Sequence, residues 1–453
     1  MNNAMQNRLL ETIQSLGGQL YLVGGSVRDG LLGLSVKDAD YVVTGIKFSS
    51  LKSNLETWAQ VNVVGASFGV LKVSSQGSTI DVALPRTERS TGIHHRDFEV
   101  SFDSSLPIQA DLARRDFTVN AMALRLSDNV LIDPFGGQSD LEQKILKAVG
   151  NPFDRFTEDP LRMLRLARFV AKLGFTVETQ TKKATQDLAH LVSSVAAERI
   201  QSELLGLLSS QKNLLTALRL LRDTGLLEQI IPEYAVCIGF EQQNPHHHLT
   251  LDEHQFVTVQ FAQNASLETK LAGLLHDMAK PATQVFGLDG VAHYYHHETR
   301  SADITREILL RLKCSHQMLE TVVKLVGNHM RPPIPSSQKA LRKFVNDLGL
   351  SWGDALELRR ADRLAHAPED WDADVWLEET RQLCASFPAD LEMFDERQLA
   401  VSGIELIERF GLSGAKIGAA KKAAASAIIE GELENEKSAI LAWLETQLQK
   451  EDA

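Results

Sequence analysis

The feature that most constrains the fold is a change in the spacing of apolar residues after Asn151-Pro152. From Glu158 onward almost every segment repeats its apolar residues with the 3.6-residue period of an amphipathic helix. The first 150 residues instead combine short β-branched runs, bounded by glycine and serine, with helical segments. We therefore predict an α+β protein: a small head around a mixed sheet, followed by about 300 α-helical residues.

Length and composition indicate a soluble protein with several domains. The 453 residues exceed the usual size of a domain built on one hydrophobic core. A content of 43% hydrophobic and 23% charged residues is typical of a soluble globular protein. No apolar run approaches the roughly 18 residues of a membrane span, and the N-terminus lacks the pattern of a signal peptide. The three scattered cysteines, Cys237, Cys314 and Cys384, predict reduced, buried thiols and a cytoplasmic location.

The charge balance argues against a protein that coats nucleic acid. A formal net charge of −12 lacks the surplus of lysine and arginine that neutralises a phosphate backbone. One stretch is nevertheless locally basic and allows RNA to be held in a single cleft. It contains Arg155, Arg162, Arg165, Arg168 and Lys172.

A glycine turn and three acidic residues form the first candidate site. Gly24-Gly25-Ser26 follows a short apolar run, so its backbone amides can approach a triphosphate without a Cβ in the way. Asp38 and Asp40 head the next strand, where residues i and i+2 face the same side. Asp81 lies in a further strand, and three carboxylates can hold two Mg²⁺ ions roughly 3.5–4 Å apart.

These residues resemble a known superfamily. Gly25-Ser26 followed by Asp38-x-Asp40 is similar to the signature of DNA polymerase β-type nucleotidyltransferases. The string GGSVRDGLLGLSVKDADYVV resembles the first motif of class II tRNA nucleotidyltransferases (CCA-adding enzymes) and bacterial poly(A) polymerases. The resemblance continues in ARRDFTVNAMA, DPFGG and EDPLRMLRLARF, in the same order. Asp81 departs from the family pattern, which often has glutamate there.

The resemblance implies a role for each matching position. Asp38, Asp40 and Asp81 would be catalytic, with Asp38 and Asp40 holding Mg²⁺. Gly25 and Arg28 would contact the triphosphate, and Arg115, Asp116 and Asn120 would line the ribose. Asp159 and Arg162 would recognise the base of CTP or ATP, and Arg165 and Arg168 would complete the pocket. The spacing of positions 158, 162 and 165, and of 161, 165 and 168, predicts that Arg162 and Arg165 share one face of one helix, with Asp159 nearby.

Histidines cluster in the middle of the chain. Ten of the fourteen lie between His246 and His329. The order His254, then His276-Asp277, then Asp362 resembles the HD phosphohydrolase superfamily, which implies a divalent metal such as Mg²⁺, Ni²⁺ or Mn²⁺ on those four residues. His296 and His329 are candidates for a second ion or for substrate phosphate, and we expect His246–His248 in a loop.

The combination resembles bacterial multifunctional CCA-adding enzymes with an HD domain. It implies a head (1–150), a helical neck for base recognition (151–230), an HD phosphohydrolase domain (231–366) and a helical tail that binds tRNA (367–453). The expected reaction adds CCA to the tRNA acceptor end from CTP and ATP, while the HD domain acts as a phosphatase, 2′,3′-cyclic phosphodiesterase or 2′-nucleotidase. We expect no membrane association and a monomer or homodimer.

Other functions remain open from the sequence. A poly(A) polymerase shares the head motifs, and an enzyme that adds only CC or only A would carry the same residues. A phosphohydrolase with an inactive head would not need the intact Asp38, Asp40, Arg115, Asp159 and Arg162. A non-catalytic RNA chaperone would need neither acidic set.

Overall fold

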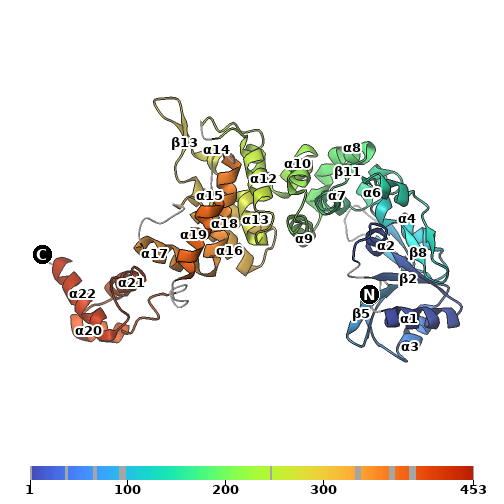
Figure 1. The fold of residues 1–453 in the computed structure, drawn as a ribbon, viewed down its shortest axis with the longest axis horizontal. Coiled ribbons are helices and arrows are strands. Elements are labelled where there is room, and N and C mark those ends of the chain that lie inside the picture. The colour runs from blue at the N-terminus through green and yellow to red at the C-terminus, as the bar shows by residue number, and fades with distance from the viewer. Residues whose placement is uncertain are drawn as a thin grey trace. The chain divides into compact units, whose positions relative to one another are not determined.

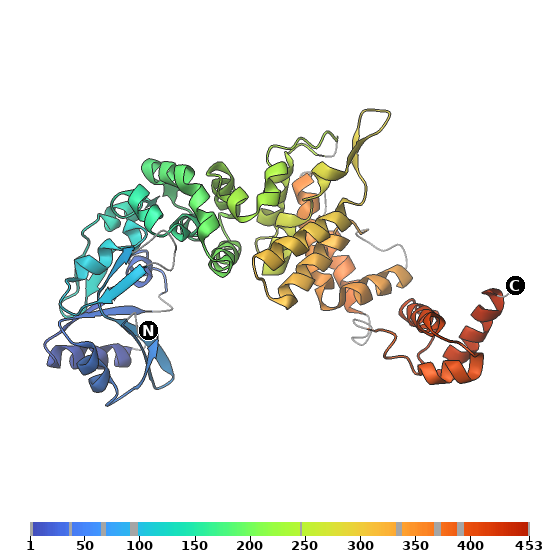
Figure 2. The same cartoon turned by 180° about the vertical axis from the view of Figure 1, so that it is seen from behind.

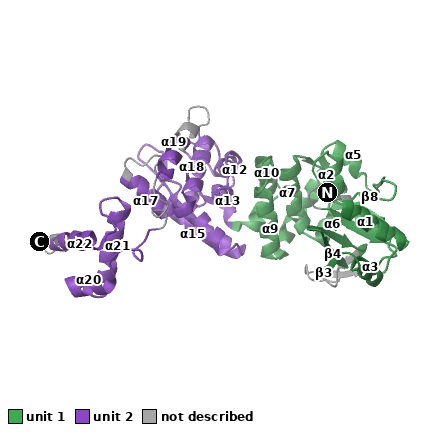
Figure 3. Cartoon of the chain, turned by 60° about the horizontal axis from the view of Figure 1, so that its bottom comes forward, with its two compact units in different colours: residues 1–232 green, residues 233–453 purple. Residues whose placement is uncertain are grey.

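The computed structural model describes residues 3–35, 39–64, 69–90, 98–244, 247–331, 338–366, 373–386 and 394–451. Its contacts divide the chain into two compact units, Met1–Pro232 and Glu233–Ala453, which Figure 3 colours separately.

A seven-stranded mixed sheet forms the first part of unit 1 (Figure 1). The strand order is β3-β4-β5-β2-β1-β8-β9, and β2 pairs with β5 in parallel while the other neighbours are antiparallel. This confirms the predicted mixed sheet. The strands are β1 (Gln19–Val23), β2 (Asp40–Thr44), β3 (Gln60–Val64), β4 (Val70–Ser75), β5 (Ser78–Ala83), β8 (Ala123–Arg125) and β9 (Val130–Ile132), and β6 (Arg86–Ser90) and β7 (Phe98–Phe102) form a separate hairpin.

One face of the sheet packs on a short helix. Tyr21 and Val23 of β1, with Val42 of β2, bury their side chains against Ile108 and Leu112. The latter two lie on α4. The opposite face is apolar and covered as well, since Leu20 and Leu22 of β1 and Tyr41 and Val43 of β2 are buried. The helices of this region are α1 (Asn3–Ser15), α2 (Gly25–Leu31), α3 (Phe48–Leu55), α4 (Ile108–Ala113) and α5 (Gly137–Glu142).

The rest of unit 1 is helical, as predicted, but the helix expected to carry the basic residues is broken. The first piece ends at Glu158 and the second begins at Leu161. Asp159 between them is extended (φ −140°, ψ 99°) because Pro160 disfavours the helical conformation of the residue before it. The helices are α6 (Pro152–Glu158), α7 (Leu161–Leu173), α8 (Thr179–Leu188), α9 (Ala197–Leu208), α10 (Leu214–Asp223) and α11 (Leu226–Ile230).

Unit 2 contains a helical bundle around one buried helix. Every residue of α13 from Thr269 to Leu275 is buried, and α13 contacts α12, α16 and α18. Figures 1 and 2 show these helices side by side from opposite directions. The main helices are α12 (Leu251–Phe261), α13 (Leu267–Leu275), α14 (Lys280–Thr283), α15 (His297–Arg311), α16 (His316–Asn328), α17 (Gln338–Leu348), α18 (Trp352–His366) and α19 (Ala373–Ala385).

The C-terminal helices have a core of their own. The helices α20 (Gly403–Phe410), α21 (Ala415–Ile429) and α22 (Lys437–Glu451) bury Leu406, Ala424, Ile440 and Leu444 together. A capping box at Ser402 and Glu405 fixes the start of α20.

The structure adds short strands to the helical prediction. A parallel pair joins β10 (Ile145–Leu146) to β11 (Thr176–Val177), and β12 (Gln284–Phe286) forms a hairpin with β13 (Ala292–Tyr294). Gly290, at φ +77°, lies in the hairpin turn, a conformation that few residues other than glycine adopt. All three cysteines are free; Cys237 and Cys384 are buried and Cys314 is partly exposed. Within the described ranges, no helix is both long and apolar enough to cross a membrane.

Candidate functional sites

Two of the three predicted acids of the head lie next to each other. The parallel pairing of β2 and β5 places Asp40 opposite Asp81, with neighbouring strands about 4.8 Å apart. Both residues are exposed, in contrast to the buried Tyr41 and Val82 that follow them. Asp38 lies outside the described residues.

The glycine turn supports this pair. Gly24 has φ +69°, and a Cβ placed on it would lie 2.4 Å from Nη1 of Arg115, so a side chain here would displace that guanidinium. Buried Ser26 accepts a hydrogen bond from the backbone N–H of Asp40 at 3.4 Å, which ties the start of α2 to the start of β2.

A chain of polar contacts links three of the sequence motifs. Arg28 donates to the side-chain oxygen of Asn120 at 2.5 Å, and Asn120 donates to Asp116 at 3.0 Å. Arg165 of α7 then forms an ion pair with Asp116 at 2.7 Å. Burial raises the pKa of Asp116, but the Arg165 guanidinium and the hydrogen bonds from Asn120 and the Phe117 N–H outweigh it and hold the pKa below its usual value. Asp116 is therefore charged at neutral pH.

Asp159 and Arg162 lie at the joint between α6 and α7. Asp159 accepts from the Leu161 N–H at 3.2 Å and from Arg199 of α9 at 3.0 Å. Arg162 is buried, and its Nη atoms donate to the Glu158 carboxylate, to the Arg155 carbonyl and to the Arg114 carbonyl. These contacts use three of its five N–H groups and fix the plane of the guanidinium.

One cavity of about 650 Å³ brings these groups together. Among the described residues that line it, nine are arginine or lysine and four are aspartate, although the whole chain carries a net charge of −12. Its size and positive charge suit a nucleoside triphosphate. The predicted residues that line it are Gly25, Arg28, Asp40, Asp81, Arg115, Asp116, Asn120, Asp159, Arg162, Arg165 and Arg168.

The sequence interpretation missed several residues of this cavity. Arg86, Arg114 and Arg199 also line it. Glu203 of α9 pairs with Arg168 at 2.6 Å and with Arg165 at 3.7 Å, which holds both guanidinium groups at the wall. Arg114 lies within the quoted string ARRDFTVNAMA, whereas Arg199 and Glu203 lie outside the quoted strings and are revealed only by the packing of α9 on α7.

In unit 2, the four residues predicted to bind a metal converge. The His254 Nε2 atom lies 3.1 Å from Asp362 Oδ1, and His276 Nε2 lies 3.2 Å from Asp277 Oδ2. The two cross distances, His254 to Asp277 and His276 to Asp362, are both 3.6 Å. All four residues are buried and come from α12, from the end of α13 and from α18.

The chemistry of these residues fits a divalent cation. Both ring nitrogens of His254, the His276 Nε2 and the Asp277 Oδ1 are buried and make no hydrogen bond within the described part of the chain. Burial lowers the pKa of His254, which keeps the imidazole in its neutral, metal-binding form. Burial also lowers the pKa of His276, but Asp277 and Asp362 more than offset this and raise it to about 10, because two buried carboxylates attract positive charge.

The structure corrects the choice within the His296-His297 doublet. The His296 side chain is 89% exposed, whereas His297 is buried and lies 3.2 Å from Asp277. His329 also joins the cluster, 3.5 Å from Asp277. His246 lies outside the described residues.

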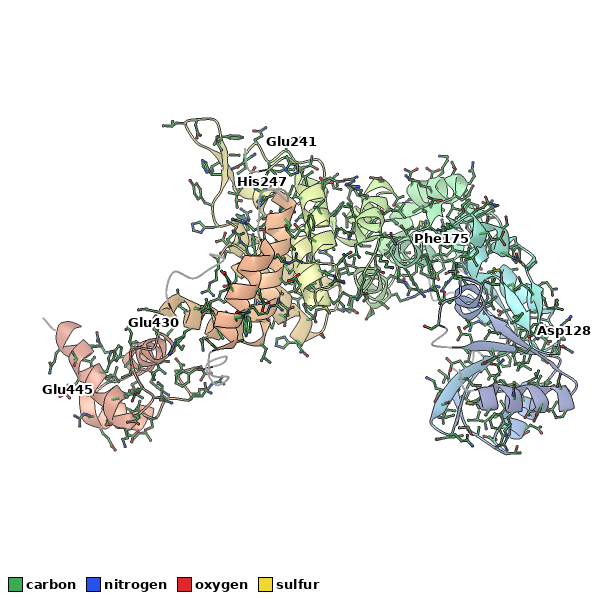
Figure 4. The ribbon with its side chains drawn as sticks, in the orientation of Figure 1. Asp128, Phe175, Glu241, His247, Glu430 and Glu445 are labelled. Carbon is green, nitrogen blue, oxygen red and sulfur yellow. The ribbon has the colours of Figure 1, made fainter. Side chains whose placement is uncertain are left out.

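Two further histidines border the cluster. His247, labelled in Figure 4, lies in the irregular segment before α12, as predicted, and contacts the ring of His366 with 4.2 Å between centroids. His366 stacks on His254 at 4.7 Å. No sequence motif pointed to a role for either residue.

Three family models match the chain in succession. One described as "Poly A polymerase head domain" matches residues 20–147, and one described as "Probable RNA and SrmB- binding site of polymerase A" matches residues 174–238. The model described as "HD domain" matches residues 251–367.

Curated relatives span most of the chain. The "Multifunctional CCA protein" of Aromatoleum aromaticum is 36% identical over 353 residues, which cover 76% of this chain and 81% of that protein. This chain belongs to the multifunctional CCA protein family. The protein of the same name from Azoarcus is 37% identical over 318 residues, 68% of this chain and 73% of that protein. The chain is thus a nucleotidyltransferase that carries an HD domain, and both of these families depend on metal ions.

Solved structures agree with the family fold. The CCA-adding enzyme of Bacillus stearothermophilus, determined in complex with CTP, is 26% identical with a TM-score of 0.73, and the match covers 100% of this chain and 99% of that one. The Thermotoga maritima CCA-adding enzyme, determined in complex with a tRNA, is 19% identical with a TM-score of 0.57 over 99% and 96% of the two chains, which shows the fold alone.

Proposed function

We propose that this chain adds CCA to the 3′ end of tRNA from CTP and ATP, without a nucleic-acid template, and releases pyrophosphate. The observation that carries the proposal is the basic cavity of unit 1. Both the Asp40/Asp81 pair and the Asp159/Arg162 pair line this cavity, so a single bound nucleotide can contact both pairs. The relatives' names and the CTP complex of a homologous enzyme favour the same reaction.

In this proposal, Asp40 and Asp81 act in the nucleotidyl-transfer step. The 3′-hydroxyl oxygen of the RNA attacks the α-phosphorus of the nucleotide, and the bond from that phosphorus to the β-phosphate bridging oxygen breaks. Two Mg²⁺ ions would lower the pKa of the attacking hydroxyl and neutralise the leaving pyrophosphate. Asp40 and Asp81, with Asp38, would hold these ions, while Gly25 and Arg28 contact the triphosphate.

We propose that Asp159 and Arg162 recognise the base of the incoming nucleotide. Cytosine and adenine both have an exocyclic amino group, which can donate a hydrogen bond to an aspartate carboxylate. The neighbouring ring nitrogen of each base can accept a hydrogen bond from an arginine. The two N–H groups of Arg162 that remain after its three internal hydrogen bonds can donate to the base. Because the other three are bound to fixed acceptors, the guanidinium is preorganised for this contact. Arg115, Asp116 and Asn120 would line the ribose, and Arg165 and Arg168 would complete the pocket.

The proposal is tested by incubating the full chain with Mg²⁺ and a tRNA that lacks its 3′ CCA. With CTP and ATP together we expect three added nucleotides, and with CTP alone we expect two. Long adenosine tails would indicate a poly(A) polymerase, and addition that stops at CC or requires a preformed CC end would indicate a partial enzyme. No incorporation under any of these conditions would refute the transferase proposal for this chain.

Arg199 gives a more local prediction. It donates to one oxygen of Asp159, so Arg199→Ala leaves that carboxylate with the Leu161 N–H as its remaining hydrogen-bond donor among the described residues. The Arg199 side chain is 41% exposed, and such ion pairs contribute at most about 1 kcal/mol. We therefore expect about a fivefold loss of kcat/KM for CTP and ATP alike, with a smaller preference for CTP over UTP.

A matched control is Lys183→Ala, which removes another exposed ion pair, with Asp187, in the same helical region. Steady-state kinetics with the three nucleotides should show no change for this control. Unchanged nucleotide selectivity in Arg199→Ala would contradict a role for Arg199 in orienting Asp159.

For unit 2 we propose hydrolysis of phosphate esters, as a phosphatase, 2′,3′-cyclic phosphodiesterase or 2′-nucleotidase. The support is the buried His254, His276, Asp277 and Asp362 set, which fits a divalent ion such as Mg²⁺, Ni²⁺ or Mn²⁺. We further propose the domain limits 1–150, 151–230, 231–366 and 367–453 for head, neck, HD domain and tail, with the tail binding tRNA and the chain acting in the cytoplasm as a monomer or homodimer.

A further inference from the structure

A buried carboxylate lies behind the cavity of unit 1 but is not part of its lining. Asp111 of α4 has no exposed surface, whereas both arginines that it contacts line the cavity. Its Oδ1 atom accepts from Nε and Nη2 of Arg114 at 2.9 and 2.7 Å, and its Oδ2 atom accepts from Nη2 of Arg115 at 3.1 Å. One carboxylate therefore holds two guanidinium groups of the cavity wall.

The environment of Asp111 keeps it charged and fixed in place. Burial raises its pKa, but the guanidinium groups of Arg115 and Arg114 outweigh burial and hold the pKa below its usual value. Its neighbours Ile108 and Leu112 on α4 belong to the core that packs against the sheet. Asp111 is therefore a rigid negative anchor for the two arginines.

The position of Arg115 depends on this anchor. Its Nη1 atom donates to the Asn120 carbonyl over a long 3.4 Å, and its Nε atom is buried without a hydrogen-bond partner in the described part of the chain. Asp111 is the one carboxylate paired with Arg115 among the described residues. The same guanidinium lies against the glycine turn, where a Cβ on Gly24 would come within 2.4 Å of Nη1. Asp111 thus determines how Arg115 is presented beside the turn.

We propose that Asp111 is a positioning residue for sugar selection, which acts through Arg115 to favour ribonucleotides over 2′-deoxynucleotides. The proposal rests on the function proposed above for Arg115, which is contact with the ribose of the bound nucleotide. A fixed donor rejects a sugar that lacks the 2′-hydroxyl, because its hydrogen bond is then left unmade. A guanidinium that is free to rotate turns to another acceptor and discriminates less.

Recognition of the base should not depend on Asp111. Arg162 donates through Nη2 to the backbone carbonyl of Arg114 at 2.9 Å, directly after the last helical residue of α4. That carbonyl stays in place when the charge of Asp111 is removed, because Leu112 anchors α4 in the core. Sugar selection and base selection can therefore be changed separately, whereas general unfolding of the site would change both.

The experiment measures single-turnover incorporation of CTP, dCTP and UTP into a tRNA that lacks its 3′ CCA, with the full chain and Mg²⁺. The test variant is Asp111→Asn, which keeps the shape of the side chain but removes its charge and one of its two acceptor oxygens. Arg115→Ala and the double variant Asp111→Asn/Arg115→Ala show whether Asp111 acts through Arg115. The matched control is Asp140→Asn, which removes the acceptor of the Thr118 hydroxyl outside the cavity lining.

We expect Asp111→Asn to lower the preference for CTP over dCTP about tenfold, and to keep the preference for CTP over UTP within about twofold of the wild type. Arg115→Ala should lose the same sugar preference, the double variant should lose no more than Arg115→Ala, and Asp140→Asn should keep both preferences. An unchanged preference for CTP over dCTP in Asp111→Asn, an equal loss of both preferences, or a further loss in the double variant would overturn the proposal.

Removing one partner of a buried ion pair can unfold a protein, so a second comparison avoids the unpaired charge. Asp111→Asn/Arg114→Met is compared with Arg114→Met, and only the first of these variants should lose the sugar preference. Equal preferences in the two would contradict the proposal, as would a wild type that incorporates CTP and dCTP equally. A wild type that incorporates no nucleotide would refute the proposed transferase reaction, whereas a sugar preference that Asp111→Asn retains would refute only the role of Asp111.

Discussion

Asp40→Asn is expected to reduce nucleotide incorporation into tRNA by at least about a thousandfold. Asparagine keeps the shape of the side chain but removes the charge that would hold Mg²⁺ beside Asp81, its register partner. Metal ions supply several kcal/mol of transition-state stabilisation, and each 1.36 kcal/mol corresponds to a factor of ten. Single-turnover incorporation of CTP into a tRNA that lacks CCA measures the effect.

The matched control is Asp128→Asn. Asp128 lies in the same unit, forms an exposed ion pair with Arg125 and accepts a hydrogen bond from the Val130 N–H. It is no part of the cavity lining, so we expect incorporation by Asp128→Asn to stay within about twofold of the wild type. Because Asp40 is exposed, its substitution should leave thermal stability nearly unchanged. Incorporation by Asp40→Asn within tenfold of the wild type would rule out a role for Asp40 in holding the ions.

Asp277→Asn is expected to abolish the hydrolysis of phosphate esters, with a loss of at least about a thousandfold. Asp277 contacts His276, His297 and Lys280, so its charge organises the whole cluster. Burial raises its pKa, but His276 and Lys280 outweigh burial and hold the pKa well below the usual value. The carboxylate is therefore ionised at neutral pH and available to a cation. Release of phosphate from a 2′-nucleotide, with Mn²⁺ or Ni²⁺ added, measures the loss.

The transferase activity of Asp277→Asn shows whether the substitution affects only the unit 2 site or unfolds the whole protein. The two candidate sites belong to separate compact units, so incorporation of CTP by Asp277→Asn should stay within about twofold of the wild type. Removing one partner of a buried ion pair costs about 3–5 kcal/mol, so unit 2 should also unfold at a lower temperature. Asp289→Asn, in the exposed turn of the β12–β13 hairpin, should change neither activity nor stability. Parallel loss of both activities in Asp277→Asn would contradict two independent sites.

The motifs of the head predicted that Asp40 and Asp81 lie in strands, but not that these two strands pair. Each acid could be assigned to a strand from the β-branched residues around it, since strand character is a property of a short segment. Their pairing depends on the parallel register of β2 and β5, which are separated by β3 and β4 in the chain. No local pattern specifies which of several strands becomes the neighbour.

The basic helix and the histidine doublet show where local spacing misleads. Pro160 breaks the predicted helix and leaves Asp159 extended, so Asp159 turns toward Arg199 instead of lying along the helix that carries Arg162. His296 adopts a left-handed conformation (φ 60°) just before α15, and His297 is the first helical residue. This change of backbone conformation directs one side chain to solvent and the other to Asp277, which the doublet alone cannot reveal.

The sequence by itself determined the α+β class, the order of head, HD domain and helical tail, and the family. These depend on the apolar period and on short motifs, which are local. Only the tertiary structure decided which side chains meet. Arg165 pairs with Asp116, 49 residues away, and Arg199 pairs with Asp159, 40 residues away. His297 and His329 lie together because α15 packs on α16. Such contacts depend on how helices pack, and packing is set by the whole core rather than by the spacing within any one segment.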